Sequence, residues 1–279
     1  CEFGNVLGHW AVTGRALGHV YEHLRAAQPD LDLFAYVSAT GSAGTLAAGD
    51  RLKEDYGARI AAVEAVECPT LLRNGFGEHN IQGIGDKHVP YVHNVYNTDY
   101  VVAVSDAATD SLFQVFNHPD GLAYLADRHG VPEATLQALS SFGLSSICNV
   151  LAAIKLAKHN NLDGSQAIIT VATDGAAMYG TEQAKFVAKR FGGRFDREAA
   201  AEAFGRYMLG VGTDNMLEAT LEDRHRMFNL GYFTWVEQQG VELADFVARS
   251  KPAFWRNLRQ LLPAWDGLID EFNAEAGVA

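Results

Sequence analysis

A glycine-rich turn between an apolar run and a helix-like segment is the part of the chain best suited to chemistry. It reads Gly41-Ser42-Ala43-Gly44-Thr45 and follows Ser38-Ala39-Thr40. Such a turn leaves backbone N–H groups unpaired at a helix N-terminus, where the positive end of the helix dipole attracts a phosphate. The glycines let the backbone approach an anion, and the two hydroxyls add donors. The pattern allows a phosphate site, although an ordinary strand-to-helix turn has the same local sequence.

The spacing of this turn lacks two common nucleotide motifs. No Lys follows Gly44, as the phosphate loop of nucleoside triphosphatases would require, and the glycines do not fit G-x-G-x-x-G. An ATPase or nicotinamide enzyme is therefore not supported. A cofactor that carries one phosphate monoester remains.

The segments around the turn predict a β-α-β unit with a parallel strand pair. Leu33 to Val37 predicts a buried strand, a helix runs from Gly44 or Thr45 to Tyr56, and residues 59–65 predict the next strand. Further strands are expected at 100–104 and at 167–172, the second of them fully buried. Helices are expected at 105–116, capped by Ser105, and at 143–159, with Lys155 and Lys158 facing solvent. Another helix is expected at 9–27, and its apolar side would carry Trp10, Leu17, Val20, Tyr21 and Leu24.

Two later features complete the expected organisation. The turn Thr173-Asp174-Gly175 follows the last strand, at the sheet edge where ligands bind in open α/β proteins. From Glu182 onward the chain looks helical, at 185–191, 197–209, 215–228 and 241–249. A helical C-terminal part is therefore expected to pack over the α/β part or over a second subunit.

Composition narrows the class of protein. The 279 residues allow one large domain or two smaller ones, and an apolar share of 48% is enough for a core. A net charge of −12 disfavours nucleic acid and anionic membranes as partners. Cys1, Cys68 and Cys148 show no zinc spacing, which indicates reduced thiols in a cytoplasmic protein. No apolar run reaches membrane-spanning length.

Five motifs in one order carry a family resemblance. They are Gly41–Thr45, residues 79–85 (HNIQGIG), 99–106 (DYVVAVSD), 143–146 (GLSS) and 171–175 (VATDG). Together they resemble the cysteine synthase group of fold-type II pyridoxal phosphate enzymes. The nearest branch looks like the larger proteins called PLP-dependent subunit beta, such as the beta subunit of 2-amino-4-ketopentanoate thiolase.

The resemblance implies a tryptophan synthase beta-like α/β fold, a parallel twisted sheet flanked by helices. Residues 1–182 would be the C-terminal part of the catalytic region and 183–279 a helical extension. Gly41, Ser42, Ala43, Gly44 and Thr45 would hold the phosphate of pyridoxal 5'-phosphate. A hydroxyl would contact the pyridine nitrogen, with Ser145 as first choice and Thr173 as second. Gly83, Ile84 and Gly85 would line the substrate side.

One departure from the family is important. The family's Schiff-base lysine lies in an S-x-K-D-R-like segment before the matched region, and this chain has no such segment. Lys87 is the only internal alternative. We therefore expect the catalytic lysine on an N-terminal fragment or subunit that packs against this chain. His79, His88 and His93 lack the spacing of a metal site, so no metal is expected.

Three functions remain open at this stage. The first is a lyase or transferase acting on a small amino acid, by β-elimination, β-replacement or thiolase-type cleavage. The resemblance implies a homo-oligomer. The second is a non-catalytic regulatory or binding subunit that keeps the fold without the lysine. The third is an unrelated α/β phosphate-binding protein.

Overall fold

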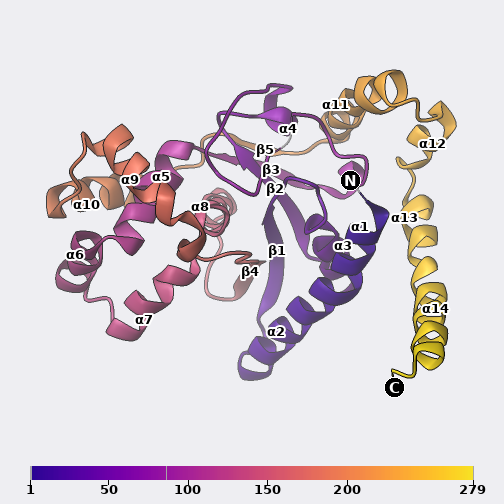
Figure 1. The fold of residues 1–279 in the computed structure, drawn as a ribbon, viewed down its shortest axis with the longest axis horizontal. Coiled ribbons are helices and arrows are strands. Elements are labelled where there is room, and N and C mark those ends of the chain that lie inside the picture. Colours follow the sequence, from indigo (N-terminus) through magenta and orange to yellow (C-terminus); the bar gives the residue numbers. More distant parts are fainter. Residues whose placement is uncertain (1, 86, 279) are drawn as a thin grey trace.

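A five-stranded sheet forms the centre of the molecule, with strand order β4-β1-β2-β3-β5 (Figure 1). The computed structural model describes residues 2–85 and 87–278, so Cys1, Asp86 and Ala279 lie outside the described residues. Strands β1 (Asp32–Ala39), β2 (Arg59–Ala65), β3 (Tyr100–Val104) and β4 (Gln166–Thr170) are parallel, and β5 (Met216–Glu218) pairs antiparallel with β3. The expected class, a mostly parallel sheet flanked by helices, is confirmed.

The central strands are buried on both faces because helices cover both. Ala61 and Val63 of β2 face the cluster that contains α5 (Asp106–Asn117) and α8 (Leu144–His159), while Ile60 and Ala62 belong to a cluster on the other face. Parallel strands covered on both sides read as continuous apolar runs. This is why the strands at 33–37, 59–65 and 100–104 could be found from sequence.

The N-terminal helical segment, called the N-terminal rod below, packs against α3 (Leu46–Tyr56) through small residues. It consists of α1 (Phe3–Gly8), a π-helical turn at His9–Thr13 and α2 (Gly14–Ala27). A Cβ on Gly14 would lie 2.7 Å from the Cβ of Arg51, so glycine allows the close approach. The prediction for the apolar side of the helix at 9–27 is partly wrong, because Val20 and Leu24 are 51% and 44% exposed.

Two expectations about the region of α8 and β4 are also wrong. Lys155 is buried, 6% exposed, because it points toward the segment that follows the π-helical turn Gly205–Leu209 and pairs with Asp214. Strand β4 ends at Thr170 and is only partly buried, because it is an edge strand of the described sheet.

Helices dominate the rest of the chain, as predicted, with one exception. Residues 215–228 were expected to be helical, but Met216–Glu218 forms β5 because Tyr100, Val101 and Val102 of β3 offer it free edge positions. The remaining elements are α4 Thr70–Arg73, α6 Pro119–His129, α7 Glu133–Ala138, α9 Gly180–Phe191, α10 Arg197–Phe204, α11 Leu221–Tyr232, α12 Leu243–Ala248, α13 Pro252–Arg259 and α14 Leu261–Ala276, with short 3-10 turns at Val95–Asn97, Leu139–Ser141 and Ala176–Tyr179 and a π-helical turn at Phe233–Gln238.

Figure 1 shows α6, α7, α9 and α10 on one side of the sheet and α11 to α14 on the other. The expected division near residue 182 stays a prediction, and α9 runs across that position. Among the described helices, none is long and apolar enough by itself to cross a membrane; one pair, Glu133–Ser141 with Leu144–His159, passes by length and composition and is bent by 112°.

Candidate functional site

The strand order creates a crevice at the carboxyl ends of β1 and β4. From β1 the chain continues through α3 to β2 on one side, while β4 pairs on the other side of β1. The loops that follow such a pair of strands diverge, and ligands of open α/β sheets bind between them. A pocket of about 100 Å³ lies there, lined from β1 by Ala39 and from beyond β4 by Val171 and Thr173.

Most of the sequence-predicted site residues line this one pocket. Gly41, Ser42, Ala43 and Thr45 come from the turn after β1, and Gly83 and Ile84 from residues 79–92, called the glycine loop below. Ser145 comes from α8 and Thr173 from the turn after β4. Gly44 and Gly85 are not among the lining residues. Gly44 is instead packed against Asn5, because a Cβ there would lie 2.1 Å from Asn5 Nδ2.

The turn after β1 lines the pocket, and its backbone amides have no partner in the described structure. Within residues 2–85 and 87–278, no group accepts a hydrogen bond from the backbone amides of residues 41–45. Ala43 has a φ of 63°, in the left-handed region, which turns the chain sharply before α3 begins. A Cβ on Gly41 would lie 3.5 Å from Gly83 O, so the two loops approach closely here. The turn therefore offers an anion several unpaired N–H donors beside a helix N-terminus.

The hydroxyls of the turn have protein partners. Asn5 Nδ2 donates to Ser42 Oγ at 3.1 Å, and the hydroxyls of Thr45 and Ser38 lie 2.7 Å apart. Ser42 is exposed, whereas Ser38 is buried. These contacts fix the side chains that surround the unpaired amides.

A second polar group lies across the pocket, at the start of α8. The hydroxyl oxygens of Ser145 and Thr173 are 3.1 Å apart, and Ser145 also donates to Asp174 Oδ1 at 3.4 Å. Tyr179 donates to the other oxygen of that carboxylate. Burial and the neighbouring Asp174 carboxylate raise the pKa of Tyr179, so its hydroxyl keeps its proton and remains a donor. The Asp174 carboxylate, itself held by Tyr179, therefore orients the Ser145 hydroxyl.

Gly143 makes this arrangement possible. A Cβ at that position would lie 2.4 Å from Asp174 Oδ1, and the Gly143 amide donates to Asp174 O at 2.9 Å. The glycine before α8 thus allows the turn after β4 to pack directly on the helix start.

Two further residues line the pocket that no sequence motif predicted, His9 and Asn149. Asn149 Oδ1 accepts from Ala39 N at 2.6 Å, and its Nδ2 donates to Val171 O at 3.0 Å. Its one sequence signal is a carboxamide inside an apolar helical run. His9 lines the pocket from the N-terminal rod, and burial lowers its pKa. Nothing in the local sequence marked it.

The glycine loop places its histidines apart from this pocket. His79 is close to Gly85, where an added Cβ would lie 2.1 Å from its Nε2, and both line a neighbouring cavity with Lys87. His93 is buried elsewhere, with Nε2 2.9 Å from Thr98 Oγ1. In the described part of the chain, no three His, Cys, Asp or Glu side chains gather as metal ligands, and no lysine lines the crevice pocket.

Comparison with known proteins gives a sequence relative and a shared fold. Cysteine synthase B of Campylobacter jejuni subsp. jejuni serotype O:2 is 30% identical over 160 residues, which cover 57% of this chain and 46% of that enzyme. The chain thus spans about half the length of the curated relative it matches. A scan against models of protein families finds no match.

Two solved structures share the fold. A hydrogen sulfide-producing enzyme from Fusobacterium nucleatum aligns with a TM-score of 0.51 at 22% identity, over 72% of this chain and 52% of that chain. A mutant hydrogen sulfide-producing enzyme aligns with the same TM-score at 20% identity, over 80% and 55%.

The family is one whose members use pyridoxal phosphate. The site fits that group by its chemistry, since it combines unpaired amides for a phosphate with neutral hydroxyls opposite. The sequence relative and the α/β fold agree with the five motifs, so the chain is similar in sequence and fold to the cysteine synthase-like, fold-type II pyridoxal phosphate enzymes.

Proposed function

We propose that this chain supplies the cofactor pocket of a pyridoxal phosphate-dependent lyase or transferase that acts on a small amino acid. The reaction would be β-elimination, β-replacement or thiolase-type cleavage at that amino acid. One observation carries the proposal: the turn of residues 41–45, whose amides are unpaired in the described structure, lines the same pocket as the hydroxyl-bearing Ser145 and Thr173. Bound pyridoxal phosphate would supply an electron sink for the carbanion next to the amino group.

The turn would act as the phosphate site. Its amides donate hydrogen bonds to phosphate oxygens, and the N-terminus of the helix Leu46–Tyr56 adds a favourable dipole. No lysine or arginine lines the described pocket, so main-chain donors would carry the recognition. Gly83 and Ile84 would leave room for the substrate on the other side.

The hydroxyl pair would contact the pyridine nitrogen. Ser145 is 5% exposed, so its position is better fixed than that of the exposed Thr173. Its one hydroxyl proton, which it donates to Asp174 Oδ1 at 3.4 Å, would turn to the ring nitrogen when the coenzyme binds. A neutral hydroxyl leaves the ring nitrogen unprotonated, which weakens the electron sink. This favours β-elimination and replacement over transamination.

The lysine that anchors the coenzyme and moves the α-proton would come from an N-terminal fragment or subunit. This rests on the pocket lining, which includes no lysine among the described residues. A homo-oligomer in the cytoplasm is proposed as the setting. Cys148 supports a reducing compartment, since it is buried and makes no disulfide.

Calorimetric titration with pyridoxine 5'-phosphate and with pyridoxine tests the phosphate site. Neither compound carries an aldehyde, so their binding needs no lysine. The phosphate ester should bind at least ~10-fold more tightly, because charge-assisted hydrogen bonds are each worth about 1.5–3 kcal/mol. Equal affinities, or no binding of either, would contradict the proposed cofactor site.

A non-catalytic binding subunit is the second candidate, and the missing pocket lysine favours it. One experiment separates the enzyme from the binding subunit. The chain is purified with whatever co-purifies, reduced with borohydride in the presence of pyridoxal phosphate, and analysed by peptide mass mapping. A modified lysine on a co-purifying polypeptide supports the enzyme. Tight binding of the phosphate ester without any specific lysine adduct supports the binding subunit.

A further inference from the structure

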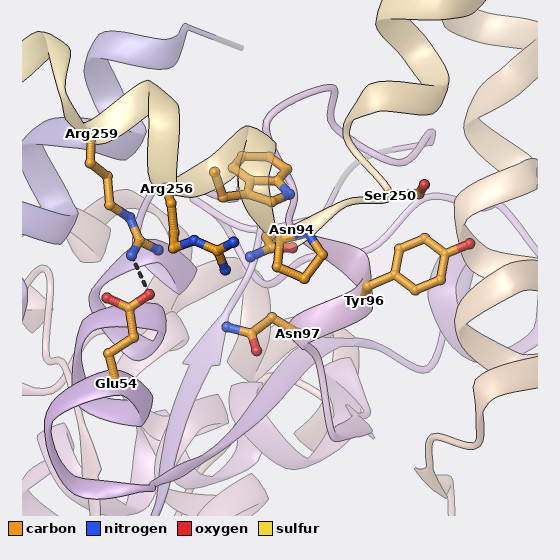
Figure 2. A pocket seen from close by; sticks show the side chains of 9 residues that line it. Glu54, Asn94, Tyr96, Asn97, Ser250, Arg256 and Arg259 are labelled. Atoms are coloured by element: carbon orange, nitrogen blue, oxygen red, sulfur yellow. Dashed lines mark hydrogen bonds and ion pairs between the residues drawn. The ribbon is translucent and has the colours of Figure 1, made fainter.

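A polar cavity separate from the cofactor pocket lies where the C-terminal helices meet the α/β part. It has a volume of about 410 Å³ and shares no lining residue with the cofactor pocket. Figure 2 shows Arg256 and Arg259 on one helix, α13, facing Glu54 of α3 and the segment that carries Asn94, Tyr96 and Asn97. Small-molecule sites commonly have volumes of about 300–1,000 Å³.

The walls of this cavity are held in place by buried contacts. Trp255 is 4% exposed, and its Nε1 donates to Arg249 O at 2.9 Å. Asn94 and Asn97 each donate from Nδ2 to the buried Asp50, at 3.2 and 2.5 Å. No described group donates to the side-chain oxygens of these two asparagines. The cavity thus offers the half-buried ring of Tyr96 and two oriented acceptors.

Among the described charged side chains that line this cavity, Arg256 is the one without an ion-pair partner. Arg259 pairs with Glu54, lies 4.0 Å from Asp50 and stacks over Trp10 at 4.7 Å. Both carboxylates are therefore engaged by protein donors. Arg256 points into the same cavity and makes no hydrogen bond or ion pair with any residue in the described ranges (Figure 2). Its guanidinium is the cavity's available charge, and its planar fork matches carboxylate or phosphate oxygens.

We propose that this cavity binds a small aromatic anion, a ring with an amino donor and a carboxylate or phosphate group. The ring would lie against Tyr96, the anionic group would bind Arg256, and the amino group would donate to an asparagine oxygen. Aromatic side chains give such a ligand apolar contact, and a guanidinium gives it orientation. This site is independent of the proposed cofactor function.

The test is calorimetric titration of the full chain with 2-aminobenzoate. Aniline, which lacks the anion, and acetate, which lacks the ring, should each bind at least ~10-fold more weakly, because each removes one of the two contacts. Comparing the affinities of 2-aminobenzoate and phenyl phosphate shows whether the site prefers a carboxylate or a phosphate. Binding should be unaffected by saturating pyridoxine 5'-phosphate, and competition between them would overturn the proposal.

Arg256→Gln should weaken 2-aminobenzoate binding at least ~10-fold without altering the melting temperature, because the side chain is exposed and unpaired in the described structure. Lys251→Gln is the matched control, since it removes the same charge from the start of the same helix without lining the cavity. Undiminished binding by the Arg256 variant, equal losses in both variants, or no binding at millimolar ligand would overturn the site. Failure here leaves the cofactor titration unaffected, so the two proposals fail separately.

Discussion

Asn149 accepts a hydrogen bond from the backbone amide of Ala39, with 2.6 Å between its Oδ1 and that nitrogen. The same side chain donates to Val171 O at 3.0 Å. One buried carboxamide, 2% exposed, therefore joins the carboxyl ends of β1 and β4. The candidate cofactor pocket opens between these two strand ends, so its width depends on this contact.

Asn149→Ala should lower the free energy of unfolding by about 2–4 kcal/mol, because two backbone groups at the strand ends lose their partner. Urea unfolding measures the change. Asn117→Ala is the control, since Asn117 Nδ2 donates only within its own helix, to Phe113 O at 2.9 Å. Equal losses in the two variants would contradict a special role for the contact between strands.

Ser42→Asp should weaken binding of pyridoxine 5'-phosphate by roughly 10-fold or more, because it places a carboxylate beside the phosphate site. The side chain is exposed, so the fold should tolerate the change. Ser42→Asn is the neutral control and should stay within about threefold of the original affinity. Binding of pyridoxine should not change in either variant. Unchanged binding of the phosphate ester in the Asp variant would place the anion elsewhere.

Ser145→Ala should weaken binding of the phosphate ester by about 5–10-fold, and Thr173→Val by less, because a hydrogen bond from a buried hydroxyl is worth more than one from an exposed hydroxyl. The two hydroxyls are 3.1 Å apart, so only a comparison of both variants separates them. Calorimetric titration gives both affinities. The reverse order would assign the ring nitrogen to Thr173.

His93 should make the fold sensitive to acid. Burial, together with the nearby Arg249 charge, lowers the pKa of His93 from 6.5 to about 3. The unfolded chain therefore binds a proton below pH 6.5 that the folded chain refuses, and this stabilisation is lost as the pH falls from 6.5 toward 3. The free energy of unfolding should drop by up to about 1.4 kcal/mol per pH unit from this group.

Urea unfolding between pH 4 and pH 7 tests the effect. His93→Gln should show a smaller slope than the original chain, because the variant loses the buried titrating group. His19→Gln, at an exposed position, is the control and should keep the slope. The same slope in all three proteins would remove His93 as the acid-sensitive group.

Local signals were enough to find the elements that carry the site. Strands β2 and β3 match the predicted ranges 59–65 and 100–104, and Ser105 accepts from Ala108 N at 3.2 Å as the predicted helix cap. Buried parallel strands and N-caps depend on residues close in sequence. The family resemblance also came from short motifs, each contained in one turn.

Features made by distant residues could not be found in this way. Strand β5 has only three residues and exists because β3 has an edge to pair with. Lys155 looked solvated by helical period, but the segment around Asp214, 59 positions later, covers it. Neither contact leaves a local pattern.

The sequence by itself determined which segments turn, cap helices or form the buried strands, because backbone conformation follows largely from residues a few positions apart. Only the tertiary structure decided that the turn after β1, the glycine loop, the start of α8 and the turn after β4 meet around one pocket. Sheet order sets that meeting, since β4 returns to pair beside β1 after more than a hundred residues. Such a return depends on how whole layers bury their apolar faces, which no short stretch of sequence encodes.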